Sequence, residues 1–313
     1  MSLERALELA AAARGRAYPN PTVGAVLVAA GGEVVAEGAT EEHGARHAEV
    51  VAIEAAGDRA RGATLYVTME PCTHHGRTPP CADRVLEAGV ARVVAASADP
   101  NPRAGGGLER LRAAGLDVEL ADSPAARRQN EAWRTWIAND RPFVTYKAAV
   151  TLDGRVTVPG SRWVTGEASR RRVHELRAAS DAVAVGMGTF RADQPRLDAR
   201  QVQVVRQPRR LVFGQGPLPE GSELELVSGP LEEELARLAA EGVQSLLLEG
   251  GPTLASAFLR ADLVDKLQLF VAPTLSGHGP RVLEELSRPI ALSSLRARPV
   301  GEDVLLEGYV HEP

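Results

Sequence analysis

The sequence predicts an α/β protein of two domains, and three observations lead to this fold class. Apolar runs typical of buried strands alternate with helical runs along the whole chain. The length of 313 residues allows two hydrophobic cores. The alternation is interrupted by a helix-breaking Asn-Asp-Arg-Pro cluster at residues 139–142 and then starts again. We therefore expect one domain over residues 1–140 and a second over residues 141–313.

In the first domain, helical runs end at glycines and short apolar runs predict strands between them. The first helix is rich in alanine, and the second places Val51 and Ala55 four residues apart on one face. The expected helices cover residues 3–14, 48–56, 82–88, 108–114 and 124–137, and the first four are followed by Gly15, Gly57, Gly89 and Gly115. The expected strands cover residues 23–28, 33–37, 64–67, 90–96 and 116–120, and a Gly-Gly turn joins the first two.

The second domain repeats this pattern after the breaker cluster. Its middle helix begins after Pro230 and has three glutamates in its first turn, where the helix dipole favours negative charge. The expected helices cover residues 167–179, 231–241 and 253–260. The expected strands cover residues 143–150, 182–185, 210–213, 245–248, 266–271 and 304–310.

Composition excludes several classes of protein. Hydrophobic residues make up 44% and charged residues 25%, which is ordinary for a globular protein. A net charge of −5 and 4% aromatic residues do not suit a nucleic-acid binder. No run of eighteen apolar residues predicts a membrane helix, and the first residues lack the layout of a signal peptide. Two cysteines without a disulfide framework fit the reducing cytoplasm, where we expect this protein.

The chemistry of the first domain is indicated by His47-Ala48-Glu49, by Pro71-Cys72 and by Cys81. A His, a Glu two residues later and a Pro-Cys followed by a second Cys are the residue set of zinc-dependent deaminases. One imidazole and two thiolates fill three positions of a tetrahedral zinc ion and leave the fourth for water. The Glu is not a ligand in this set and moves protons. The usual Cys pair is separated by two residues, whereas eight separate the pair here.

A structural zinc site is the alternative reading of the same residues. Such a site closes its coordination shell with four protein ligands. His74 or His75 could supply the fourth ligand. This reading leaves Glu49 without a role, which favours the catalytic reading.

Several stretches resemble a known family, the bacterial bifunctional enzymes of riboflavin biosynthesis. They are Asn20–Gly24, His47–Val50, Glu70–Cys81 and Asp99–Pro102 in the first domain, and Arg141–Val144, Lys147, Leu152–Arg155, Trp163–Gly166 and Glu249–Leu254 in the second. The resemblance runs from about Leu3 to about Val310. It implies a cytidine-deaminase-like α/β/α domain followed by a dihydrofolate-reductase-like α/β domain.

In the first domain the resemblance implies that His47, Cys72 and Cys81 bind zinc and that Glu49 is the proton shuttle. It also implies substrate contacts. Asn20 matches a position near the pyrimidine, and the positions that match those holding the ribose phosphate are His74, Arg77, Asp99 and Asn101.

In the second domain the resemblance implies a reductase site that uses NADPH. The positions matching substrate contacts are Ser161, Arg177, Leu197, Arg200 and Glu249, and Arg177 and Arg200 suit a phosphate clamp. The positions matching cofactor contacts are Ala149, Trp163, Thr165, Thr189, Asp193, Gly251, Pro252, Thr253 and Leu254. The loop before residue 254 follows an apolar run and opens a helix, a setting in which glycines let the backbone approach phosphate. A second glycine loop at residues 186–189 does not complete a dinucleotide-binding fingerprint.

The function that follows from the resemblance has two steps. A ribosylated diaminopyrimidinone phosphate loses an amino group by hydrolysis, and the sugar is then reduced to a ribityl chain. We expect phosphorylated ribosyl-pyrimidine substrates, no nucleic acid, no membrane and a homo-oligomer. The chain departs from the family pattern at Thr40, Gln194 and Phe213.

Two other functions are compatible with the zinc motif alone. A tRNA or nucleic-acid deaminase with an unrelated second domain is disfavoured by the acidic charge, the few aromatic residues and the long Cys spacing. A zinc-stabilised binding module without catalysis is disfavoured by the presence of Glu49. Release of ammonia from a small phosphorylated pyrimidine, but not from tRNA, distinguishes the three functions.

Overall fold

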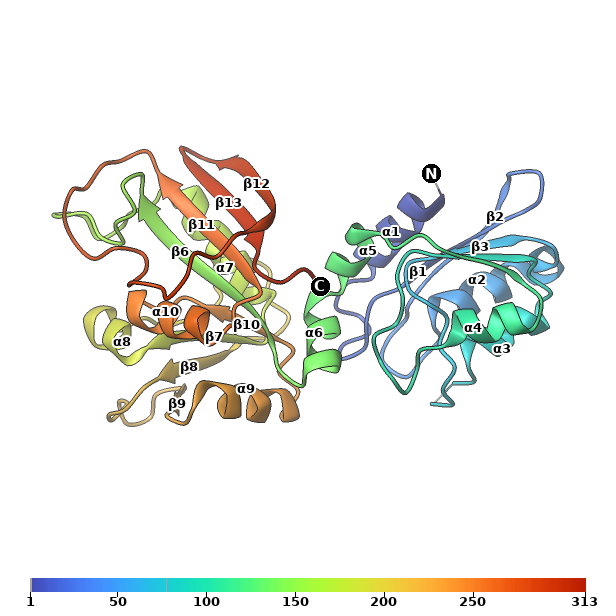
Figure 1. The fold of residues 1–313 in the computed structure, drawn as a ribbon, viewed down its shortest axis with the longest axis horizontal. Helices are drawn as coiled ribbons and strands as arrows, with labels where there is room; N and C mark the ends of the chain where they lie inside the picture. Colours follow the sequence, from blue (N-terminus) through green and yellow to red (C-terminus); the bar gives the residue numbers. More distant parts are fainter. Residues whose placement is uncertain (1, 77) are drawn as a thin grey trace. The chain divides into compact units, whose positions relative to one another are not determined.

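The computed structural model of the chain describes residues 2–76 and 78–313 (Figure 1). The chain forms two compact units, the first reaching Asn139 and the second running from Asp140 to Glu312. The division falls within the helix-breaking cluster at residues 139–142. Each unit has its own hydrophobic core.

The first unit is built on a sheet that, within the described residues, has five strands in the order β2-β1-β3-β4-β5. Strand β1 pairs antiparallel with β2 and β3, whereas β3, β4 and β5 run parallel. The strands are β1 (Gly24–Val28), β2 (Val34–Ala39), β3 (Thr64–Val67), β4 (Arg92–Ala95) and β5 (Asp117–Leu120). The parallel direction brings the loops that follow β3 and β4 to one edge of the sheet.

Helices cover both faces of this sheet. They are α1 (Ser2–Ala12), α2 (Ala48–Ala56), α3 (Cys81–Glu87), α4 (Gly107–Ala113), α5 (Pro124–Gln129) and α6 (Glu131–Asn139), with a short 3₁₀ turn, η1 (Gly57–Ala60), after α2. Helix α2 contacts α3, α3 contacts α4, and α1 contacts α5. Figure 1 shows α2, α3 and α4 together beside the sheet.

Two glycines show which face each helix covers. A Cβ atom at Gly24 would lie 2.0 Å from the carbonyl oxygen of Ala6 on α1, and a Cβ at Gly38 would lie 2.2 Å from that of Ala48 on α2. Gly38 pairs with Ala25, the residue after Gly24, and successive strand residues face opposite sides. Helices α1 and α2 therefore lie on opposite faces of the sheet. The expected α/β/α layering is confirmed.

The second unit contains an eight-stranded sheet, counted over the described part of the chain, in the order β12-β13-β11-β6-β10-β7-β8-β9. The six strands from β11 to β9 run parallel, and β13 and β12 add an antiparallel edge. The strands are β6 (Phe143–Thr151), β7 (Ala182–Gly186), β8 (Arg209–Phe213), β9 (Leu224–Val227), β10 (Ser245–Leu248), β11 (Lys266–Ala272), β12 (Ser293–Val300) and β13 (Asp303–Tyr309).

Four helices accompany this sheet in the described residues: α7 (Glu167–Ala178), α8 (Met187–Asp193), α9 (Leu231–Ala240) and α10 (Pro252–Arg260). The central strands β10 and β7 are mainly apolar, as expected for parallel strands that helices cover on both faces. Phe258 of α10 packs edge-on against Phe213 of β8, with 5.5 Å between the ring centroids. Aromatic pairs of this geometry contribute beyond the area they bury.

Three elements of the second unit were not predicted from the sequence: α8, β9 and β12. Strand β12 is exposed along nearly its whole length and contains Pro299, so it shows no buried periodicity. It forms because β13 pairs with it, with a register shift between Ser293 and Arg296. Helix α8 begins in the glycine loop at residues 186–189, after which the sequence predicted no helix.

The prediction of one continuous helix over residues 124–137 is wrong. The chain breaks at Asn130 into α5 and α6. The buried Asn130 side chain accepts a hydrogen bond from the Thr22 N–H at 2.8 Å and donates one to the Thr22 carbonyl at 2.9 Å. These bonds reach across 108 residues of sequence. A local pattern cannot reveal a break that a distant backbone segment imposes.

A buried ion pair joins the start of β6 to the start of β11 in the second unit. Asp265, 2% exposed, accepts two hydrogen bonds from the Arg141 guanidinium, both at 2.7 Å. One of the two Asp265 carboxylate oxygens also accepts the Val144 N–H at 2.8 Å. The carboxylate therefore ties the segment leading into β6 to the residue that precedes β11.

We predict that Asp265→Asn destabilises the second unit by about 3–5 kcal/mol, because it leaves the Arg141 charge buried and unpaired. The matched control is Glu225→Gln, which breaks a more exposed pair with Arg209 in the same sheet and should cost less than about 1 kcal/mol. Amide hydrogen exchange of β6 and β11 in rising urea measures both losses. Equal losses in the two variants would contradict the prediction.

Candidate functional site

Three potential metal ligands of the first unit meet at one point. His47 immediately precedes α2, Cys72 lies in the loop after β3, and Cys81 is the first residue of α3. Their ligand atoms lie within 4.8 Å of one another. The Nδ1 atom of His47 is 3.2 Å from the Cys81 sulfur and 3.7 Å from the Cys72 sulfur.

The close packing described for Gly38 fixes the position of His47. Because the backbone of β2 touches the first turn of α2, the residue that precedes this helix has little freedom. Cys81 is held through its backbone, since its N–H points at the Cys72 sulfur at 3.4 Å. The N–H of Ala82 binds the Cys72 carbonyl at 3.1 Å. The start of α3 therefore holds the loop that contains the other thiol.

The charges of this cluster depend on the contacts among its members. The hydrogen bond from the Cys81 thiol lowers the pKa of Cys72 to about 4. The same contact, together with burial, raises the pKa of Cys81. The Cys72 sulfur raises the pKa of His47 to about 9, although burial opposes this shift. Such mutual shifts are typical of donor groups held together at a site for a cation.

The cluster fits a zinc ion by both chemistry and spacing. Nitrogen and thiolate sulfur are preferred zinc ligands, and tetrahedral geometry with bonds of 2.0–2.3 Å separates such atoms by about 3.6 Å. The distances from His47 Nδ1 to the two sulfurs are close to this value. Among the described residues the cluster has these three members, whereas His74 and His75 have exposed side chains outside it. The arrangement favours an open fourth position over a closed structural site.

Glu49 lies on the first turn of α2, two residues after His47. Its side chain is 3% exposed, and burial raises the pKa of its carboxyl to about 7. A carboxyl group with this pKa gains and loses a proton near neutral pH, as a general acid–base group must.

The remaining substrate positions expected in the first unit fall into two groups. Asp99 and Asn101 lie together in the loop after β4, where the Asn101 N–H binds the Asp99 carboxylate at 2.8 Å. Burial raises the pKa of Asp99 to about 6. Asn20 and His74 are exposed, and Arg77 lies outside the described residues.

In the second unit, Glu249 lies just after β10 and accepts hydrogen bonds from two cations. The Arg177 guanidinium on α7 donates to its two oxygens at 2.6 and 3.0 Å, and the Lys147 ammonium on β6 lies 3.5 Å from one of them. Burial alone would raise the pKa of Glu249, but the charges of Lys147 and Arg177 bring it to about 2. The carboxylate stays charged over the whole physiological range.

Lys147 was not predicted as a site residue. The available signal was a lysine within an otherwise apolar strand, since a buried ammonium group requires a partner. Asp198 was also missed. Its buried carboxylate accepts from Arg200 at 2.5 Å and from Arg196 at 3.1 Å.

The Arg177 guanidinium has few donors left for a phosphate. Besides Glu249, it binds the Asp198 carbonyl at 3.1 Å. Arg200 is partly exposed and holds the Asp198 carboxylate through a single nitrogen. Arg177 and Arg200 therefore both contact Asp198, the first at its backbone carbonyl and the second at its carboxylate. A clamp formed by both arginines stays a prediction.

The expected cofactor loops also meet in the structure. The Gly251 N–H donates to the Thr189 hydroxyl at 3.0 Å, and a Cβ at Gly251 would lie 2.7 Å from that oxygen. Gly251 precedes α10, whose first residue is Pro252. The N-terminus of a helix attracts anions, and a glycine just before it has no side chain to block their approach. This arrangement suits an anion such as a dinucleotide phosphate.

The other substrate and cofactor residues expected in the second unit differ in their exposure and in their contacts. Trp163 is half exposed, and two arginine side chains lie 5.1 and 5.2 Å from its ring centre. Ser161 donates its hydroxyl to the Trp163 carbonyl at 2.8 Å. The buried core includes or adjoins Leu197, Thr165 and Ala149. Leu254 packs against two glycines. The side chains of Thr253 and Asp193 are exposed.

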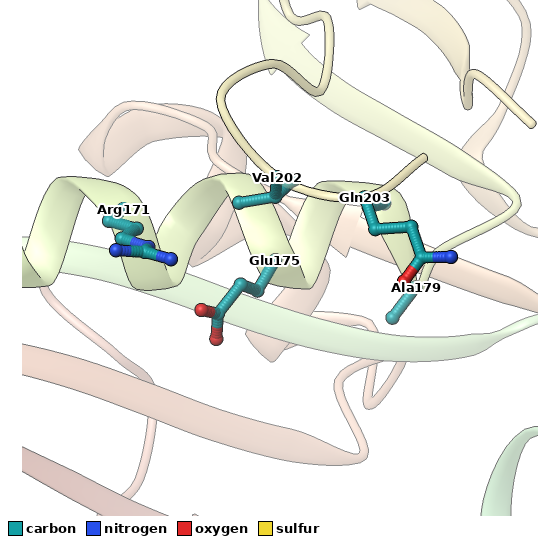
Figure 2. Close-up of a pocket in the computed structure, with 6 residues that line it drawn as sticks. Arg171, Glu175, Ala179, Val202 and Gln203 are labelled. Atoms are coloured by element: carbon teal, nitrogen blue, oxygen red, sulfur yellow. The ribbon is translucent and has the colours of Figure 1, made fainter. Parts of the chain in front are cut away.

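A shallow hollow lies on a different face of α7 from Arg177. Figure 2 shows Arg171 and Glu175 of α7, and Ala179 just after its end, beside Val202 and Gln203 of the loop that passes over the helix. None of the site residues predicted from the sequence lines this hollow. It is therefore separate from the Glu249 cluster.

Comparison with known proteins places both units in one family. The model of the cytidine and deoxycytidylate deaminase zinc-binding region matches residues 2–97, and the model of the RibD C-terminal domain matches residues 142–306. RibD of Mycobacterium tuberculosis (strain H37Rv) is 41% identical, over 96% of this chain and 94% of its own length. The chain belongs to the RibD family of riboflavin biosynthesis proteins. RibD of Escherichia coli (strain K12) is 38% identical over 97% of each chain.

Solved RibD structures agree with this assignment. RibD of Acinetobacter baumannii matches with a TM-score of 0.85 and 34% identity, over 98% of this chain and 97% of its own. A Thermotoga maritima protein matches with a TM-score of 0.83, 34% identity and the same coverage. It is described as a diaminohydroxyphosphoribosylaminopyrimidine deaminase/5-amino-6-(5-phosphoribosylamino)uracil reductase.

These matches confirm the resemblance to bifunctional riboflavin-biosynthesis enzymes. A deaminase with an unrelated second domain is excluded, because the RibD C-terminal model covers most of the second unit. No helix in the described part of the chain has the length and apolar character that crossing a membrane requires.

We predict that the purified protein holds about one zinc ion per chain and that Cys72→Ser loses most of it, because a serine hydroxyl is a poor replacement for a thiolate ligand. His75→Ala is the matched control and should keep its zinc. Metal analysis of the dialysed proteins measures both. Zinc lost equally from His75→Ala would favour the closed structural site instead.

Proposed function

We propose that this chain is a bifunctional enzyme that performs both reactions named for its Thermotoga maritima relative. The observation that carries this proposal is the meeting of His47, Cys72 and Cys81 beside the buried Glu49, in a chain whose second unit belongs to the RibD reductase family. The substrates are phosphorylated ribosyl-pyrimidines. A homo-oligomeric state and a cytoplasmic location stay predictions.

In the deaminase step, His47, Cys72 and Cys81 hold zinc, which when bound makes water a stronger nucleophile at neutral pH. Glu49 accepts a proton from the attacking water and delivers it to the pyrimidine ring nitrogen. It then takes the proton of the newly added hydroxyl group and passes it to the amino group, which leaves as ammonia while the carbonyl forms. Its pKa of about 7 lets the same carboxyl act first as base and then as acid. Asp99 and Asn101 bind the ribose phosphate side of the substrate.

In the reductase step, the loop of Gly251 and Thr189 would hold NADPH, and the cofactor would supply the hydride for reduction of the sugar C1′. Glu249 offers a permanently charged acceptor for sugar hydroxyl groups. Arg177 and Lys147 keep this carboxylate ionised and oriented. Arg200, which is more exposed than Arg177, binds the substrate phosphate.

We predict that Glu49→Gln keeps its zinc but lowers deaminase kcat by a factor of about 10²–10⁴, because an amide cannot carry the proton. Ammonia release from the diaminopyrimidinone substrate measures the loss. Reductase activity in the same variant is the internal control and should be unchanged. Deamination within a few-fold of the parent would show that Glu49 is not the proton shuttle.

We predict that Arg200→Lys raises the KM of the reductase for its phosphorylated substrate by about ten-fold or more, since a lysine loses the forked contact with phosphate. The Kd for NADPH should be unchanged. Arg196→Lys is the matched control, because Arg196 pairs with the same Asp198 carboxylate but is far more exposed. Equal effects on phosphorylated and dephosphorylated substrates would assign Arg200 to the scaffold.

A further inference from the structure

We propose that Glu70 is a positioning residue of the deaminase, which holds the substrate loop of residues 98–108 against the loop that contains Cys72. This inference rests on the proposed function of the first unit. The sequence motif includes Glu70, but none of the steps described above uses it. Its side chain is 8% exposed, and a buried carboxylate must be compensated by hydrogen bonds or charge.

Both carboxylate oxygens of Glu70 accept backbone N–H groups from the substrate loop. One oxygen binds the Asp99 N–H at 3.0 Å, and the other binds the Leu108 N–H at 2.9 Å. Asp99 is an expected substrate contact, and Leu108 lies in the first turn of α4. The side chain therefore closes the substrate loop at both of its ends.

The backbone of Glu70 is itself fixed to the end of the sheet. Its N–H binds the Ser97 carbonyl at 2.9 Å, next to the strand end of β4. Cys72 follows two residues later. One residue thus connects the metal-ligand loop to the loop that contains Asp99 and Asn101.

Further contacts support the same junction. Thr73 donates its N–H to the Ala104 carbonyl at 2.9 Å and its hydroxyl to the Gly105 carbonyl at 2.9 Å. A Cβ at Gly107 would lie 1.7 Å from the Pro71 carbonyl oxygen, so the two backbones touch there. The two loops form one packed layer, and Glu70 contributes charge-assisted hydrogen bonds between them.

A carboxylate is the group that this position requires. Two N–H groups that point at one side chain need two acceptor oxygens. Glutamine has one oxygen and turns its NH₂ group toward the second N–H, where no hydrogen bond can form. Glu70→Gln therefore removes one loop contact while keeping the size and shape of the side chain.

The test compares Glu70→Gln with Glu109→Gln, which changes an exposed glutamate on α4. The first measurement is amide hydrogen exchange over residues 98–108 in the full chain with zinc bound. We expect exchange of the Asp99 or Leu108 amide to rise by about ten-fold in Glu70→Gln, as the loss of one charge-assisted hydrogen bond implies, and to stay unchanged in the control.

The second measurement is deaminase kinetics. We expect KM for the pyrimidine substrate to rise about ten-fold in Glu70→Gln, with kcat within a few-fold of the parent, full zinc content and unchanged reductase activity. Unchanged exchange together with an unchanged KM would overturn the proposal, and so would loss of zinc. The parent protein itself could fail to deaminate the pyrimidine substrate while Glu70→Gln still speeds amide exchange of the loop. That result would support the positioning role of Glu70 and refute the proposed deaminase function.

Discussion

The direction of the parallel strands is the constraint on which both sites depend. All parallel strands of a sheet present their carboxyl ends at one edge, so the residues that follow them meet there. In the first unit, Cys72 follows β3 and Asp99 follows the neighbouring β4. In the second unit, Glu249 follows β10 and Thr189 follows the neighbouring β7. Each site therefore brings together residues that are distant in sequence but follow neighbouring strands, and nearby helices and strand β6 supply its other residues.

Two buried glutamates show how the surroundings determine the chemistry of one residue type. Glu49 is buried, and the opposing charge of His47, the one cation that acts on it among the described residues, leaves its pKa raised to about 7. Glu249 also has little of its side chain exposed, but Lys147 and Arg177 bring its pKa to about 2. The first carboxyl can exchange a proton during a reaction, whereas the second serves as a fixed charge. Desolvation is common to both, and the difference comes from the cations within hydrogen-bond reach.

Most of the fold could be predicted from the sequence because apolar runs mark most of the strands and glycines follow several of the helices. Strand β12 and helix α8 could not, because neither has a buried periodic pattern. The break at Asn130 was hidden for a different reason. Its cause is a pair of hydrogen bonds to Thr22, more than a hundred residues away.

The sequence by itself determined the kind of chemistry and the family, because the His-Ala-Glu and Pro-Cys motifs are local and specific in their residue types. The tertiary structure decided which groups act together. It paired Glu249 with Lys147 and Arg177, which lie 102 and 72 residues away, and it joined Glu70 to Leu108, 38 residues away. Sheet topology sets these partnerships. A buried charge is stable only where the fold brings it a partner, and the spacing of residues along the chain does not show which residue that partner is.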